Sequence, residues 1–244
     1  ISFMSDANAF LLGEALSGAA REAVSPIGIT LGTGFGFASM KERRLMVGES
    51  LIPYGALWNR PFRDGIVEDY VSRRAIRARY QTLKRCSDLP DVREIADQAR
   101  QGDAEALETF RQTGRFLGEI LAAPVREYGA DLVVVGGQIA RSQDLFLDEA
   151  RALLDCPIVS AAHIDDAALR GAAQYGLLGT ARIGIVLLKD KLPAGIIAAP
   201  RAGHERAIAE IPQYSDSRRG CKQHCGGDDI PSVFCLHSGR APNT

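Results

Sequence analysis

The sequence predicts an α/β protein in which strands and helices alternate around a layered sheet. Two observations lead to this class. The β-rich runs 26–31 and 131–135 each end in glycines, and helical apolar spacing follows the second run. Another short β-rich run, at 156–159, precedes a further helical segment and repeats the alternation. Hydrophobic residues make up 46% of the 244 residues and charged residues 24%, as in an ordinary globular domain.

The charge balance excludes several function classes. Twenty-nine Lys and Arg against 30 Asp and Glu give a net charge of −1, so no charge excess favours a nucleic-acid partner or an anionic membrane. The longest apolar runs, such as 132–135, are too short to cross a bilayer. Only Cys86 and Cys156 occur in the body of the chain, which therefore has no disulfide framework, and we expect a cytoplasmic protein.

The first third of the chain predicts a helix followed by a hairpin. Apolar residues recur at helical spacing over 6–20, and Asp6 is placed to cap the first turn. The run 26–31 reads as a strand that turns through glycines at 32–36 and resumes at 37. A second short strand follows at 44–47, and the loop after it, with prolines and glycines up to residue 65, should be irregular.

The rest of the chain is mostly helical until a second strand appears. Helices are expected near 68–77, 91–100 and 103–128, the last with one continuous apolar face. A buried strand at 131–135 leads through Gly136 and Gly137 into a helix from about residue 142. A strand at 156–159 and a helix at 165–178 complete the alternation, and the proline-rich segment 185–244 should be poorly ordered.

Two glycine segments are candidates for phosphate binding. Gly32, Thr33 and Gly34 lie between two predicted strands, where glycines let the backbone approach a ligand with free N–H groups. A hairpin turn that needs positive φ gives the same pattern. Gly136 and Gly137 follow a buried strand, and they can either admit a nucleotide or make a strand-to-helix turn.

Three carboxylates are candidates for chemistry. Asp6 can be a helix cap, the commoner role, or a general base. Glu49 and Glu68 flank the irregular loop and can be solvated or can accept hydrogen bonds from ligand hydroxyls. Near the C-terminus, Cys and His residues at 221, 224, 225, 235 and 237 could supply ligands for one zinc ion, but their spacing fits no standard pair arrangement and we favour incidental residues.

Taken together, these motifs resemble the ROK family, which includes bacterial sugar kinases such as glucokinases and related repressors. The resemblance runs from about residue 3 to 180, and its segments occur in family order: Ser5–Ala9, Thr30–Gly34, Gly48–Glu49, Gly65–Ser72, Val135–Ile139 and Gly171–Ala173. It implies the actin-like, ribonuclease-H-like ATPase fold. Residues 1–66 would hold the remnant of the N-terminal lobe and the start of the C-terminal lobe, 67–184 the C-terminal α/β lobe with a helical subdomain, and 185–244 a tail.

The resemblance also implies site roles. Asp6 would be the catalytic base. Sugar would be bound by Ser5, Asn8, Glu49 and Glu68, and ATP with Mg²⁺ by Gly32, Thr33, Gly34, Gly136 and Gly137. Ser5 stands where the family has Asn, which weakens one expected sugar contact. The family's zinc loop has no Cys or His counterpart between Leu51 and Tyr70, so no structural metal is expected.

Two functions follow from the resemblance. The leading one is ATP-dependent phosphorylation of a hexose, with a sugar and a nucleotide as partners and self-association compatible with the family. No segment before Asp6 could supply the family's first phosphate loop, so we expect an incomplete kinase that is inactive alone. The alternative is a sugar-sensing repressor without its DNA-binding domain. The presence of Asp6 and the absence of a basic recognition helix argue against it.

Overall fold

The computed structural model describes residues 2–48, 52–87, 89–183, 185–187 and 233–236. Its strands are β1 (Ser2–Ser5), β2 (Pro26–Leu31), β3 (Phe35–Lys41), β4 (Arg44–Val47), β5 (Pro61–Phe62), β6 (Gly65–Ile66), β7 (Leu132–Gly136), β8 (Ile158–Ser160), β9 (Ile185–Leu187) and β10 (Val233–Leu236). Six of them form a mixed sheet in the order β8-β7-β2-β3-β4-β9, and the pairs β1-β10 and β5-β6 form two small sheets. The mixed sheet confirms the α/β class.

The helices are α1 (Asp6–Ser17), α2 (Glu68–Val71), α3 (Arg73–Lys84), α4 (Val92–Arg100), α5 (Ala104–Tyr128), the 3-10 helix η2 (Gln138–Leu145), α6 (Leu147–Arg151) and α7 (Ala167–Ile183). Side-chain caps explain several of their starts. Asp103 accepts the N–H of Ala106 at the start of α5, and Asp91 with Glu94 forms a capping box on α4. None of the described helices is both long and apolar enough to cross a membrane.

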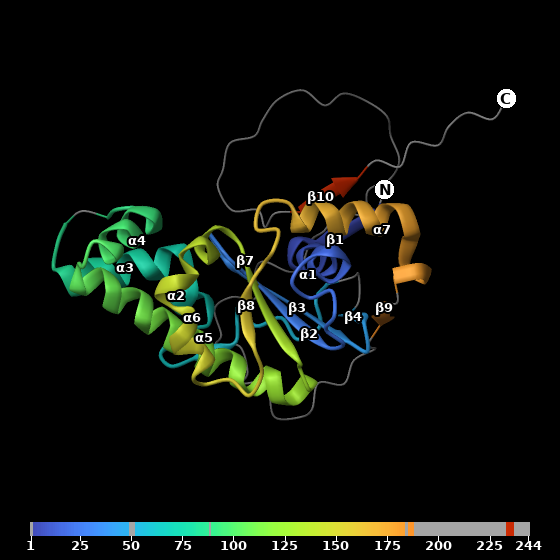
Figure 1. The fold of residues 1–244 in the computed structure, drawn as a ribbon, viewed down its shortest axis with the longest axis horizontal. Coiled ribbons are helices and arrows are strands. Elements are labelled where there is room, and N and C mark those ends of the chain that lie inside the picture. Colours follow the sequence, from blue (N-terminus) through green and yellow to red (C-terminus); the bar gives the residue numbers. More distant parts are fainter. Residues whose placement is uncertain (1, 49–51, 88, 184, 188–232, 237–244) are drawn as a thin grey trace, which may run out of the picture. The chain divides into compact units, whose positions relative to one another are not determined.

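One face of the sheet is covered by α1 and α7, which lie side by side (Figure 1). Small residues let these layers approach closely. Leu11 of α1 packs onto Gly28 in the centre of β2, and a side chain on Gly171 of α7 would overlap the carbonyl oxygen of Ala9. Gly13 of α1 meets the backbone of Ala167 in the same way. The two helices therefore pack backbone against backbone.

The opposite face carries large side chains. Ile27, Ile29 and Leu31 point from β2 into a core that α2 to α6 close from the other side. Phe110 of α5 is fully buried there and stacks on Phe146, with 6.5 Å between the ring centroids. Alternation along β2 thus sends bulky residues to one face and Gly28 to the other, as expected for a strand buried on both sides.

Several element boundaries differ from the sequence-based expectation. The N-cap of α1 is Ser5 rather than Asp6, since the Ser5 hydroxyl accepts the N–H of Asn8 at 3.2 Å. The single helix expected over 68–77 divides at Ser72, whose extended backbone ends α2 and whose side chain caps α3. The helix expected from residue 142 begins earlier, as η2, because Gly137 has φ +81° and turns the chain directly after β7.

The main sheet takes strands from both sides of residue 66. Strands β2 to β4 precede that residue and β7 to β9 follow it, and β2 pairs in parallel with β7. Within 185–244, where poor order was expected, residues 185–187 form β9 on β4 and 233–236 form β10 on β1. The remainder of that predicted tail lies outside the described residues.

Candidate functional site

The carboxyl ends of β2 and β7 lie next to each other, and the start of α1 covers them. Thr30 of β2 pairs with Gly136 of β7 in a parallel ladder. The first turns of α1 reach the same place, because the ring of Phe10 fills the space above Gly136 and Ala7 lies against Gly36. The two glycine segments and Asp6 therefore meet at one edge of the sheet, where open α/β sheets bind ligands.

Asp6 is the first residue of α1 and is half-buried at this edge. Its Oδ1 accepts the N–H of Ala7 at 2.7 Å. Burial raises the pKa of the Asp6 carboxyl, and the hydrogen bonds from backbone N–H groups oppose that shift. A carboxylate whose pKa is moved toward neutrality can accept a proton from a hydroxyl, which suits a general base.

The two polar neighbours of Asp6 have different environments. Ser5 is half-buried and its Oγ is used as the helix cap, so its hydroxyl hydrogen is the group it can offer to a ligand. Asn8 is fully buried, with no exposed surface. The structure thus places Ser5 and Asp6 at the accessible start of α1 and Asn8 in its interior.

The glycine turn is tied to the start of the helical layer through Glu68. A Glu68 carboxylate oxygen accepts the N–H of Phe35 at 3.1 Å, and a side chain on Gly34 would come within 2.7 Å of that oxygen. The N–H of Gly32 binds the carbonyl of Gly34 at 3.1 Å. Among the described residues, the N–H groups of Thr33 and Gly34 have no such partner, so these two donors suit an anion.

Packing alone explains why positions 136 and 137 are glycine. A side chain on Gly136 would overlap the ring of Phe10, and Gly137 combines φ +81° with backbone contact to Leu31. Both positions therefore require glycine before any ligand is considered. Their role toward a nucleotide stays a prediction.

Two sets of predicted site residues are not placed. Glu49 lies outside the described residues, and so do all members of the Cys and His cluster near the C-terminus except the backbone of Cys235 in β10. Within the described part of the chain, no three His, Cys, Asp or Glu side chains gather as a metal site would require.

A buried acid of α1 was not among the predicted site residues. Glu14 of α1 has no exposed surface, and its carboxylate accepts three backbone N–H groups. A signal was available, since Glu14 continues the buried stripe Ala7, Phe10 and Leu11 at helical spacing. A charged residue in such a stripe needs a built partner.

A second missed group lies past the carboxyl ends of β7 and β8. Arg141 of η2 donates to Gln138 at 3.0 Å and forms an ion pair with Asp165, which follows β8. The Arg141 guanidinium lowers the pKa of Asp165. Each of the three residues is polar and solvent-accessible, so nothing in their spacing marks them in advance.

Comparisons with known proteins identify the family and the fold. Residues 1–183 match the model of the ROK family. A glucokinase from Thermotoga maritima is 28% identical over 200 residues, covering 69% of this chain and 63% of the relative. A ROK glucokinase from Streptomyces griseus, solved with glucose and AMPPNP, is 25% identical with a TM-score of 0.63, covering 70% of this chain and 66% of that one.

The fold is also shared with a regulator. A ROK transcriptional regulator homologous to the Escherichia coli MLC protein has a TM-score of 0.63 at 20% identity, covering 70% of this chain and 50% of that one. At that identity the likeness concerns the fold alone. The chain spans less than two thirds of the length of the glucokinase it matches.

Proposed function

This chain belongs to the ROK family and has its actin-like fold, and from that premise we propose that it acts in the ATP-dependent phosphorylation of a sugar. The observation that carries the proposal is the position of Asp6. A half-buried carboxylate with a raised pKa begins α1 at the sheet edge where the glycine turn presents the N–H groups of Thr33 and Gly34.

The chemistry follows from these groups. A sugar hydroxyl oxygen attacks the γ-phosphorus of ATP, the bond from that phosphorus to the β,γ-bridging oxygen breaks, and ADP leaves. Asp6 takes the hydroxyl proton, while the N–H groups of Thr33 and Gly34 stabilise phosphate charge. Mg²⁺, when bound with ATP, supplies further charge neutralisation. Phosphoryl transfer depends chiefly on such positioning and electrostatics.

The sugar would lie against the start of α1. Ser5 offers its hydroxyl hydrogen, and Glu49 remains a predicted acceptor for sugar hydroxyls. Glu68 is better suited to holding the glycine turn, because its carboxylate already accepts the Phe35 N–H. We assign it to the geometry of the phosphate segment rather than to the sugar.

Asp6→Asn tests the assigned base. In a form of the protein that shows sugar-dependent ATP turnover, that turnover should fall by a factor of about 10² to 10⁴, the usual contribution of a general base. Asp148→Asn, at an exposed position on α6, is the matched control and should keep full turnover. Equal rates for wild type and Asp6→Asn would remove Asp6 from the mechanism.

Ligand binding can be followed separately from turnover. Trp58 is the single tryptophan of the sequence and is 47% exposed, and its carbonyl accepts the N–H of Glu68 at 3.0 Å. Its fluorescence therefore reports on the segment beside the glycine turn. Titration with glucose, fructose and N-acetylglucosamine, with and without AMPPNP, would rank sugars, and no response to any of them would contradict a sugar site here.

The second candidate is a sugar-responsive regulator, favoured by the shared fold of the ROK regulator. It predicts sugar binding without ATP turnover in every form of the protein. It also predicts that Asp6→Asn leaves the response to sugar intact. We further propose a cytoplasmic location and treat self-association as a question for sedimentation.

A further inference from the structure

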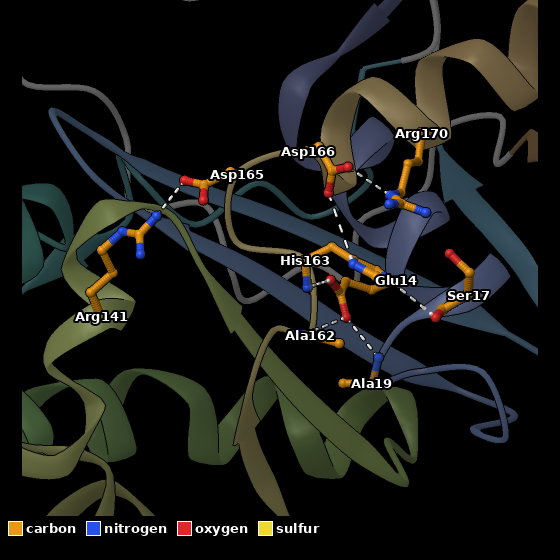
Figure 2. A network of polar contacts seen from close by, with 9 residues as sticks. All are labelled: Glu14, Ser17, Ala19, Arg141, Ala162, His163, Asp165, Asp166 and Arg170. Carbon is orange, nitrogen blue, oxygen red and sulfur yellow. Dashed lines mark hydrogen bonds and ion pairs between the residues drawn. The ribbon is translucent and has the colours of Figure 1, made fainter.

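A buried carboxylate fastens the C-terminal half of α1 to the loop between β8 and α7. One carboxylate oxygen of Glu14 accepts the N–H groups of Ala19 at 2.7 Å and Ala162 at 3.0 Å. The other accepts the N–H of His163 at 2.8 Å. Figure 2 shows these bonds converging on Glu14 from two segments far apart in the sequence. Among the described residues no ion pair includes Glu14, and its carboxylate oxygens accept backbone N–H groups.

The donor set explains why a carboxylate stands here. Three N–H groups need acceptors, and a carboxylate offers acceptor sites only. An amide of the same shape would turn an NH₂ group toward at least one backbone N–H. Leaving a buried donor unsatisfied is costly, so Gln cannot replace Glu14 without opening the contact.

The loop itself is held from both sides. The His163 ring nitrogen Nε2 lies 3.1 Å from the carbonyl oxygen of Ser17, which ties the end of α1 a second time. Asp165 pairs with Arg141 beyond the end of β7, and Asp166 pairs with Arg170 at 2.9 Å on α7 (Figure 2). The loop 162–166 is thus attached to α1, η2 and α7 at once.

Close packing transmits this attachment along α1. Gly13 and Gly171 bring the backbones of α1 and α7 into contact, which leaves no room for one helix to slide on the other. Eight residues separate Glu14 from Asp6, or about 12 Å along a helix. A tilt at Glu14 therefore displaces Asp6 at the other end of the same rigid segment.

We propose that Glu14 is a positioning residue, which fixes α1 on the β8–α7 loop and so sets Asp6 against the glycine segments at the sheet edge. The inference rests on the proposed phosphoryl-transfer function. Glu14 touches no reacting atom and acts through α1.

Glu14→Gln tests the proposal by splitting two kinetic constants. We expect kcat to fall at least tenfold while KM for ATP stays within twofold, because Asp6 is displaced and the N–H groups of Thr33 and Gly34 are not. The matched control is Leu117→Ala, which opens a cavity among buried residues of α5 on the opposite face. It should lower Tm by at least as much as Glu14→Gln and leave kcat of the folded protein unchanged.

Hydrogen exchange gives a readout that needs no activity. In Glu14→Gln the amides of 9–13 should exchange at least tenfold faster, while those of β2 and β7 keep their protection. In Leu117→Ala the amides of α1 should be unaffected. Unchanged protection of α1 in Glu14→Gln would overturn the proposal even if turnover were lost.

The outcomes also separate the two proposals. If no form of the wild type, with or without further N-terminal residues, shows sugar-dependent ATP turnover but Glu14→Gln loosens α1, the proposed function fails and the mechanical role of Glu14 stands. If turnover is present and Glu14→Gln lowers Tm without changing kcat, the positioning role fails and the proposed function stands.

Discussion

The two faces of the main sheet are built on opposite principles. Between α1 and α7 the backbones touch at glycine and alanine, and a single added methyl at Gly171 would overlap a backbone carbonyl. Toward α2 to α6 the space is filled by large side chains such as Phe110 and Leu117, with no exposed surface. One face is characterised by the close approach of helix backbones, and the other by large side chains that fill the space.

The two layers therefore contribute differently to the position of the site and to stability. Backbone-to-backbone contact fixes α1 in position and orientation, and α1 carries Asp6 at the candidate site. The bulky face holds the larger cluster of buried apolar residues, and stability depends chiefly on such burial. We therefore expect substitutions on the bulky face to change the free energy of unfolding most, and substitutions on the close-packed face to change the site for a smaller loss of stability.

The largest effect is expected for Phe110→Ala. Removing a fully buried ring that stacks on Phe146 should lower the free energy of unfolding by about 3–5 kcal/mol. Urea denaturation measures the loss. Sugar and nucleotide affinities of the protein that remains folded should not change, and a large drop in either affinity would break the distinction between the faces.

Gly171→Ala should be the next in size. The added methyl cannot be accommodated beside Ala9 without separating α1 from α7, and overpacking of this kind costs about 1–3 kcal/mol. Gly48→Ala is the control, since its nearest neighbour would be 3.9 Å away. Thermal unfolding of both variants tests the prediction, which fails if the two lose the same stability.

A surface pair of the helical layer should contribute much less. Arg100 binds Asp144 through two nitrogens, at 2.8 and 3.0 Å, and both side chains are partly exposed. Arg100→Ala should cost about 0.2–1 kcal/mol, and high salt should reduce the difference from wild type. A loss above that of Gly171→Ala would contradict the ranking.

Acidification should remove stabilising ion pairs from the layer of α2 to α6 and remove a destabilising contribution from the start of α1. Arg73, Lys84 and Arg100 lower the pKa values of Asp91, Asp103 and Asp144, so these pairs stabilise fully above the ordinary value of 3.8 and are lost as pH falls through the lowered values.

Burial instead raises the pKa of Asp6, so acidification removes a penalty at the start of α1. As the pH falls from 5.5 to 3, the backbone amides of α3 and α4 should therefore be the first to exchange faster. Asp6→Asn should remove the opposing contribution from α1, and equal pH responses of wild type and Asp6→Asn would count against the assigned burial effect.

Much of the fold could be predicted because local patterns specify it. Composition and spacing predict the hairpin through residues 32–34, the buried strand before Gly136 and the long helix up to Tyr128. They do not predict the split at Ser72, because a cap that interrupts a helix depends on which side chain turns back onto the backbone. The pairing of β2 with β7 requires tertiary contact as well.

The candidate residues of the site could be named from the sequence, and their roles stay predictions. Asp6 and the glycine turn lie at one edge of the sheet. Glu68 was predicted to bind the sugar, and its carboxylate accepts the N–H of Phe35, a contact that only the fold decides. Glu14 was passed over since an acid in an apolar stripe is explained only by the loop that meets it.

The order in which the chain folds follows from where β7 enters the sheet. Contacts within the segment from α1 to β4 join residues that are close in the sequence. By contrast, the carboxylate of Asp131, just before β7, accepts the N–H of Ser25 from 106 residues away. Contacts that distant form late, because the chain between them must be restrained first. We expect pulse-labelled exchange to protect the β2–β3 hairpin before β7. The sheet edge that brings Asp6 together with Gly136 and Gly137 would then be among the last parts of the molecule to form.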